Sequence, residues 1–224
     1  MTEGAPVLSV RDLHFPALPP MTFDIRRGEI AFLRDENYNT GRRLHECFLG
    51  DRGWTSGFFR LNGRLYQPGD LGRVIGSEIG IQIERPDRPG GVLFDNMTAL
   101  DNLCTSLIPK AGQHIIRKKI VSSILSEALR WFPKEMLLQP LSSWSYPERL
   151  RFSYYRWYLL NPRLLICFFP FAGQESTHHK MIIDLLVLCA QRGMAVWIIS
   201  SGIDAICEKT DNEEFLRRLH YLNK

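Results

Sequence analysis

The chain has 224 residues, of which 45% are hydrophobic, and its 28 basic and 24 acidic residues give a formal net charge of +4. This length and composition predict a sizeable core, and because charges of both signs are interspersed along the chain, charge alone does not indicate a nucleic-acid-binding protein. No apolar run approaches the roughly 18 residues of a membrane-spanning helix, and the first residues lack the pattern of a signal peptide, so we expect a cytoplasmic protein.

The first third of the chain alternates apolar and polar residues in short segments. This alternation predicts antiparallel strands at 7–13 and 21–25, followed by a short buried strand at 30–33. A polar loop over 34–41 comes next, and apolar residues at helical spacing predict a helix at 42–49. Strand, loop and helix in this order are typical of a phosphate-binding loop.

The middle third combines strand and helix patterns. Residues 56–64 predict a short strand with an Asn-Gly turn, which joins the earlier antiparallel strands. A further strand is expected at 78–84, and the proline and glycine residues of 85–91 predict a loop. A helix begins at 98–103 with a Thr cap, and 113–132 continues the helical region.

The last third holds the most apolar segments of the chain. The unbroken apolar run from Leu164 to Phe169, followed by proline and glycine, predicts a strand buried on both faces. Helices are expected at 145–160 and 179–192, a second buried strand at 195–199, and a basic amphipathic helix at 212–224. Strands that alternate with helices predict a mainly parallel sheet with right-handed crossovers.

Five segments, in this order, carry a resemblance to a known family. They are Gly28-Glu29-Ile30, SGFFRLNG at 56–63, VLFDNMTALDNL at 92–103, the stretch 156–166 that contains NPRLLI, and VWIISS at 196–201. Over about residues 7 to 210 the chain resembles the ATP-binding cassette of ABC transporters, most nearly the second cassette of tandem ATPases from bacterial monosaccharide importers. The resemblance implies an α/β, P-loop NTPase-like fold with a mainly parallel central sheet, an N-terminal antiparallel β subdomain and a helical insertion.

The resemblance also implies a division of the chain. Residues 1–224 form a single domain. Within it, 7–75 include the antiparallel part and a remnant phosphate loop, 95–150 form the helical subdomain, and 212–224 are the C-terminal basic helix.

The remnant phosphate loop departs from the family pattern GxxxxGK[ST]. That pattern uses glycines to wrap phosphate, a lysine to neutralise it and a hydroxyl to hold magnesium. Counted without gaps from Gly28, the place of the first glycine holds Asp35, the place of the lysine holds Gly41, and Arg42 replaces the hydroxyl. An aspartate facing triphosphate would repel it by roughly 1 kcal/mol at about 4 Å in water. The remnant comprises Asp35, Asn37, Tyr38, Thr40, Gly41, Arg42 and Arg43.

The remaining catalytic positions are replaced as well. By resemblance, Phe168 takes the place of the magnesium-binding aspartate, Phe169 that of the catalytic glutamate and Gly202 that of the switch histidine. We expect Phe168 to be buried beside the loop that contains Tyr38 and Thr40.

Two further family motifs are altered. The signature LSGGQ falls on 144–148, where only Ser145 survives, and Glu175 stands where the family has aspartate. The magnesium-sensing glutamine corresponds either to Gln82 or to Glu84.

These replacements predict a catalytically inactive pseudo-ATPase, with no metal site and with no ATP or magnesium expected as cofactor. We expect a structural or regulatory binding module of a sugar-type ABC transporter, which docks on a permease through residues 84–102 or pairs with an intact ABC ATPase. Such a partner would hold it at the inner face of the membrane. One alternative is a signalling or transcription-regulating module, although the sequence carries no nucleic-acid fingerprint. Another is the ATP-binding half of a heterodimeric ABC ATPase.

Overall fold

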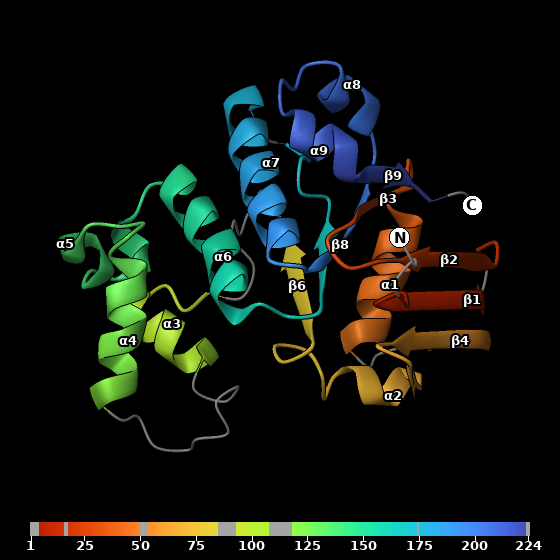
Figure 1. Ribbon diagram of the computed structural model, residues 1–224, viewed down its shortest axis with the longest axis horizontal. Coiled ribbons are helices and arrows are strands. Elements are labelled where there is room, and N and C mark those ends of the chain that lie inside the picture. The colour runs from red at the N-terminus through yellow and green to blue at the C-terminus, as the bar shows by residue number, and fades with distance from the viewer. Residues whose placement is uncertain are drawn as a thin grey trace.

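Two β-sheets form the framework of the computed structural model, which describes residues 5–15, 18–49, 53–84, 93–107, 118–173 and 175–222 (Figure 1). The strands are β1 Leu8–His14, β2 Met21–Ile25, β3 Ile30–Arg34, β4 Ser56–Leu61, β5 Arg64–Tyr66, β6 Ile79–Ile83, β7 Leu164–Phe168, β8 Ala195–Ser200 and β9 Leu219–Tyr221. The helices are α1 Asn39–Leu49, α2 Pro68–Leu71, α3 Ala99–Leu107, α4 Lys118–Ala128, α5 Lys134–Leu137, the 3₁₀ helix η2 Leu141–Ser143, α6 Tyr146–Leu160, α7 Ser176–Gln191, α8 Ile203–Cys207 and α9 Glu213–Arg218.

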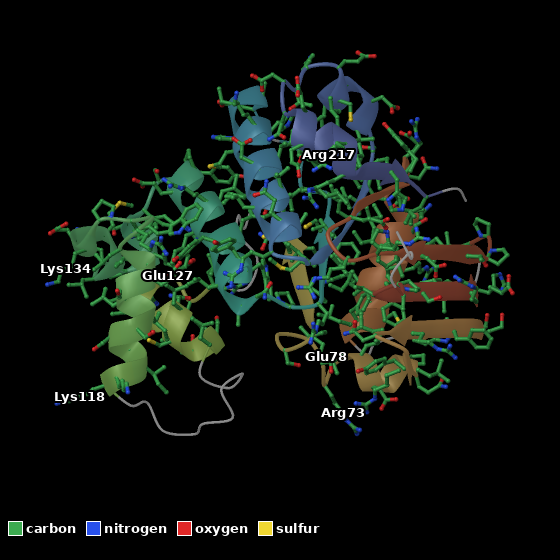
Figure 2. The ribbon with its side chains drawn as sticks, viewed as in Figure 1. Arg73, Glu78, Lys118, Glu127, Lys134 and Arg217 are labelled. Carbon is green, nitrogen blue, oxygen red and sulfur yellow. The ribbon has the colours of Figure 1, made fainter. Side chains whose placement is uncertain are left out.

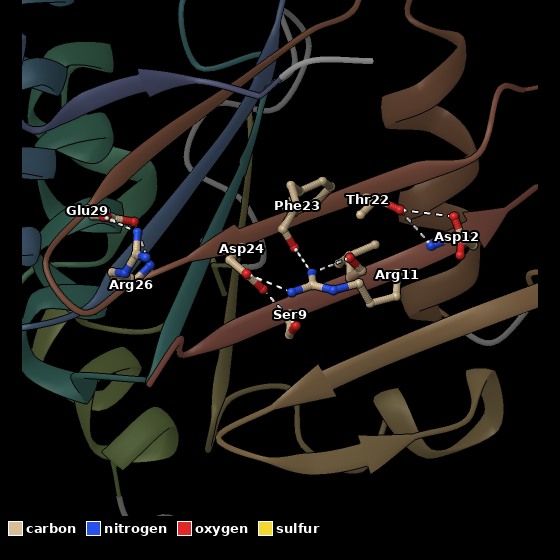
Figure 3. A network of polar contacts seen from close by, with 9 residues as sticks. Ser9, Arg11, Asp12, Thr22, Phe23, Asp24, Arg26 and Glu29 are labelled. Atoms are coloured by element: carbon tan, nitrogen blue, oxygen red, sulfur yellow. Dashed lines mark hydrogen bonds and ion pairs between the residues drawn. The ribbon is translucent and has the colours of Figure 1, made fainter. Parts of the chain in front are cut away.

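The smaller sheet is antiparallel, with strand order β2-β1-β4-β5. Its strands alternate buried and exposed residues, as the sequence predicted, because one face packs on the core and the other meets solvent. On the exposed face, Asp24 accepts hydrogen bonds from Arg11 Nη2 and Ser9 Oγ, both at 2.7 Å (Figure 3). The Arg11 hydrogen bond is the main reason why the pKa of Asp24 is lowered.

The larger sheet is parallel, with strand order β6-β7-β8-β3-β9. Every residue of β7 and β8 is buried, as expected for strands covered on both faces. Alternate residues serve different faces: Ile166 and Phe168 pack in the cluster that includes α1, and Leu165 and Cys167 pack with α6 and α7. The prediction of a mainly parallel α/β sheet is confirmed.

The helices α3 to α6 form a third hydrophobic cluster, at the side of the molecule away from the antiparallel sheet (Figure 1). The aromatic side chains of α6 belong to this core: Phe152 and Tyr155 lie 5.8 and 5.3 Å from the ring of Phe132. Thr98 caps α3 as predicted, since its Oγ1 accepts from the backbone N–H of Asp101 at 3.0 Å. The predicted loop 85–91 and the start of the predicted helix at 113–117 lie outside the described residues.

The C-terminal segment corrects the prediction of one basic helix over 212–224. Helix α9 ends at Arg218, and Leu219–Tyr221 form β9, parallel to β3. The outer edge of β3 offers backbone groups that need partners, and Leu222 N donates to Phe32 O at 2.8 Å. That long-range pairing outweighs the local helical pattern. The first turn of α9 is moreover acidic, with Glu213 and Glu214.

Candidate functional site

The remnant phosphate loop lies at the carboxyl edge of the parallel sheet, where β3, β7 and β8 end together. Asp35 N donates to Ser200 O and Phe169 N donates to Ile199 O, both at 2.9 Å. These bonds hold the residues that follow β3 and β7 against the end of β8. In open parallel sheets, this edge is where ligands bind.

The carboxylate of Asp35 binds the first turn of α1. Asp35 is 2% exposed, and its two oxygens accept from Gly41 N at 2.8 Å and from Thr40 N at 3.2 Å. The first N–H groups of a helix have no intrahelical partners and carry partial positive charge, which makes them an anion site. Here the anion comes from the chain itself, so these two backbone donors are already engaged.

The ring of Phe169 covers Gly41. A Cβ atom built on Gly41 would lie 2.5 Å from Phe169 Cζ, closer than real side chains approach. Phe169 has φ of 54° and Tyr38 has φ of 56°, in the left-handed region that non-glycine residues rarely adopt, and their ring centroids lie 4.8 Å apart. A residue larger than glycine at 41 therefore requires Phe169 to move.

Phe168 is buried, as predicted, and its neighbour Phe169 packs on the loop. Phe168 is fully buried and its ring centroid lies 5.6 Å from that of His45 on α1. The aromatic partner of Tyr38 is Phe169. The reason is the twofold alternation of strand side chains, which directs Phe168 to the α1 face, whereas the left-handed turn after β7 directs Phe169 to the loop.

The two candidates for the magnesium-sensing residue, Gln82 and Glu84, are hydrogen-bonded to each other. Gln82 is fully buried: its Nε2 donates to Glu84 at 2.6 Å and to Ser153 at 3.0 Å, and its Oε1 accepts from Trp157 Nε1 at 2.8 Å. Its amide is thus engaged in a core network. Glu84 follows β6, so it is the residue at the carboxyl edge of the sheet.

The signature remnant begins α6. Glu148 Oε2 accepts from Ser145 N at 2.8 Å and from Ser145 Oγ at 2.6 Å, which closes a capping box. Pro147 in the first turn has no N–H to offer a ligand. This helix N-terminus, like that of α1, carries a carboxylate of its own chain.

The other predicted positions are one residue in an ion pair on α1, two residues that precede helices and two exposed residues. Arg43 lies 3.6 Å from Glu46 in an ion pair on α1. Gly202, in left-handed conformation, precedes α8, and Glu175 precedes α7. Asn37 and Arg42 are exposed.

Sequence reasoning treated Asp35 as a charge that repels a nucleotide and missed its role as an acceptor for α1. A short acidic residue shortly before a helix was the available signal, because aspartate favours helix N-termini. The described residues contain no group of three or more His, Cys, Asp or Glu side chains arranged to bind a metal ion. Within that same part of the chain, no helix combines the length and the apolar composition of a membrane span.

Comparison with known sequences links the chain to sugar-import proteins. No protein-family model matches it. It is 26% identical over 212 residues to a protein of Pseudomonas syringae pv. tomato that carries the provisional name ribose/galactose/methyl galactoside import ATP-binding protein, covering 93% of this chain and 40% of that protein. It is 23% identical over 202 residues to the galactofuranose transporter ATP-binding protein YtfR of Escherichia coli K12, covering 90% and 39%. The chain thus spans less than half the length of these curated relatives.

Comparison with solved structures gives the fold. The structure of cbiO1 from Clostridium perfringens, part of the ABC transporter complex cbiONQ, matches with a TM-score of 0.73 and 20% identity, over 97% of this chain and 85% of that one. The ADP conformation of MJ1267, an ATP-binding cassette of an ABC transporter, matches with a TM-score of 0.71 and 15% identity, over 98% and 88%.

Proposed function

This chain has the ATP-binding cassette fold, and from that premise we propose that it is a pseudo-ATPase, which serves as a structural or regulatory binding module of a sugar-type ABC transporter. The observation that carries the proposal is the carboxylate of Asp35 on Thr40 N and Gly41 N. A phosphate at this helix N-terminus would have to displace that carboxylate and then lie beside its negative charge.

The residues at the catalytic places support the same proposal. Phosphoryl transfer depends on charge neutralisation, bound magnesium and a positioned water. Gly41 supplies no cation, and Phe168 and Phe169 supply no carboxylate to hold the metal or orient water. In addition, the Phe169 ring leaves no space for a side chain at 41. When bound, a magnesium nucleotide would supply electrophilic phosphorus, and this chain offers it neither a cation at 41 nor an acid at 168 or 169.

Titration calorimetry with Mg-ATP tests the proposal. We expect no binding in the millimolar range for the natural chain. A variant that combines Asp35→Gly, Gly41→Lys and Phe169→Glu removes the internal carboxylate and the covering ring, and we expect it to gain measurable heat. Millimolar or tighter binding with ATP turnover by the natural chain would contradict the proposal.

The proposed partner is a sugar permease, and the association would place the chain at the membrane. This part of the proposal is supported by the sugar-import names of its relatives and by Phe94, which is 53% exposed within the segment expected to dock. The loop of Phe94 is held in place, since Asn102 Oδ1 accepts from Phe94 N at 2.8 Å and Asn102 Nδ2 donates to Phe94 O at 3.0 Å.

Co-sedimentation with membranes that contain a permease of a bacterial monosaccharide importer tests the partner. We expect Phe94→Ser to abolish the association. Phe58→Ser is the matched control, because Phe58 is 52% exposed but lies on β4. Equal association of both variants would contradict docking through this segment.

A further inference from the structure

A cleft of about 530 Å³ lies at the amino edge of the parallel sheet, the edge opposite the remnant phosphate loop. Its walls come from the segments that lead into four neighbouring strands, β3, β6, β7 and β8, and from the turn between β4 and β5. The lining residues are Arg27, Asn62, Ser77, Glu78, Asn161, Pro162, Arg163, Arg192 and Gly193. This volume is within the usual range of small-molecule sites.

The lining contains three arginines and one acid, Glu78. Arg192 is engaged: its Nη1 donates to Tyr158 O at 3.0 Å, and its guanidinium lies 4.5 Å from the centre of the Tyr158 ring. Arg27 and Arg163 differ, because among the described residues neither guanidinium has a hydrogen-bond or ion-pair partner. Two guanidinium groups in one cleft are therefore available to bind a ligand.

The backbone is adapted to bring Arg27 there. Gly193 has φ of 88°, and a Cβ atom at this position would overlap Arg27 Nε. Glycine thus permits both the turn between α7 and β8 and the passage of the Arg27 side chain across it.

The positive charge of the three arginines in the cleft exceeds the negative charge around them. Helices α6 and α7 end beside the cleft, and each helix C-terminus carries about half a negative charge. Together with the carboxylate of Glu78, they offset about two of the three arginine charges. In the last turn of α6, the carbonyl of Tyr158 already accepts a hydrogen bond from Arg192. The excess and the unpaired donors belong to Arg27 and Arg163.

We propose that this cleft binds a phosphate monoester of a small polyhydroxylated compound. Guanidinium groups bind phosphate through two parallel N–H···O bonds, which assigns the phosphate to Arg27 and Arg163. Glu78 and Ser77 place a carboxylate and a hydroxyl group in the same cleft, where they can bind ligand hydroxyls. The site goes beyond the proposed function, since it shares no residue with the Asp35 loop.

Titration calorimetry at low salt, with glucose 6-phosphate as the probe, tests this proposal. We expect millimolar or tighter binding of glucose 6-phosphate, weaker binding of inorganic phosphate and no binding of glucose. Arg27→Gln and Arg163→Gln should each weaken binding about tenfold, since each loses a charge-assisted hydrogen-bond pair. Thermal melting of both variants should match the natural chain, because neither guanidinium has a structural partner.

Arg73→Gln is the matched control, with the same change of charge on an arginine whose side chain is 82% exposed and which does not line the cleft. Arg73 and Glu78 are labelled in Figure 2. Loss of binding in Arg73→Gln equal to that in Arg163→Gln would overturn the proposal, as would the absence of glucose 6-phosphate binding. Binding to phosphatidic acid vesicles without binding of glucose 6-phosphate would overturn it in favour of a lipid headgroup.

Discussion

The two edges of the parallel sheet differ in whether their charged groups are paired. At the carboxyl edge, the backbone N–H groups of Thr40 and Gly41 donate to the Asp35 carboxylate, and the ring of Phe169 covers Gly41. At the amino edge, Arg27 and Arg163 share a cleft without partners among the described residues. The carboxyl edge thus carries a carboxylate of its own chain, and the amino edge carries arginines without an acidic partner in the described part of the chain. The comparison places the unpaired positive charge at the edge of the sheet opposite the Asp35 loop.

The largest expected change in stability comes from a substitution that places a methyl group against the Phe169 ring. Gly41→Ala should destabilise the protein by about 1–3 kcal/mol because the new methyl group overlaps Phe169, and this outweighs the roughly 0.5–1 kcal/mol that alanine gains in a helix. Urea denaturation measures the difference.

Gly69→Ala in α2 is the control, since no atom lies within 4 Å of the added Cβ. The double variant Gly41→Ala/Phe169→Gly should recover most of the loss, because it removes the ring and suits the left-handed backbone. No recovery would show that the overlap is not the cause.

The next effect concerns the internal anion of the closed edge. Asp35→Ala leaves Thr40 N and Gly41 N without their acceptor and should destabilise the protein by about 1–2 kcal/mol. Added phosphate should restore part of this stability if the vacated helix terminus accepts an external anion. Thermal melting with and without phosphate measures both effects, and Glu36→Gln, an exposed neighbour, serves as the control. A melting temperature unchanged in Asp35→Ala would contradict the role of the carboxylate.

The smallest expected change in stability concerns the ion pair of Asp24 with Arg11, an arginine that, unlike Arg27 and Arg163, has a partner among the described residues. The pKa of Asp24 is lowered, first by the hydrogen bond from Arg11. A carboxyl whose pKa is lower in the folded state stabilises the protein above its unfolded pKa of about 3.9, and that contribution is lost as pH falls through the folded value. Asp24→Asn should therefore reduce stability at neutral pH, and the difference should shrink below about pH 4.

Urea denaturation across this pH range checks the prediction. Asp12→Asn on the same strand is the comparison. A difference between Asp24→Asn and the natural chain that stays constant with pH would rule out the ionised pair as its source.

Much of the fold could be predicted because local patterns carry it. The alternation of β1 and β2, the unbroken apolar character of β7 and β8 and the caps of α3 and α6 follow from residues close together in the chain. β9 could not be predicted in this way, because Leu219–Tyr221 become a strand only through the edge that β3 presents to them.

The sequence by itself determined the order and spacing of the segments from which Gly41, Phe168 and Phe169 are expected at the catalytic places, because motif order and spacing count residues along the chain. Only the tertiary structure decided what they do there. It brought Phe169 against Tyr38 and Gly41, made Asp35 the hydrogen-bond acceptor for α1, and placed Arg27 and Arg163, from segments far apart in the chain, in one cleft. The physical reason is that hydrogen bonds, overlaps and clefts depend on where strands and helices meet in space, which local pattern does not encode.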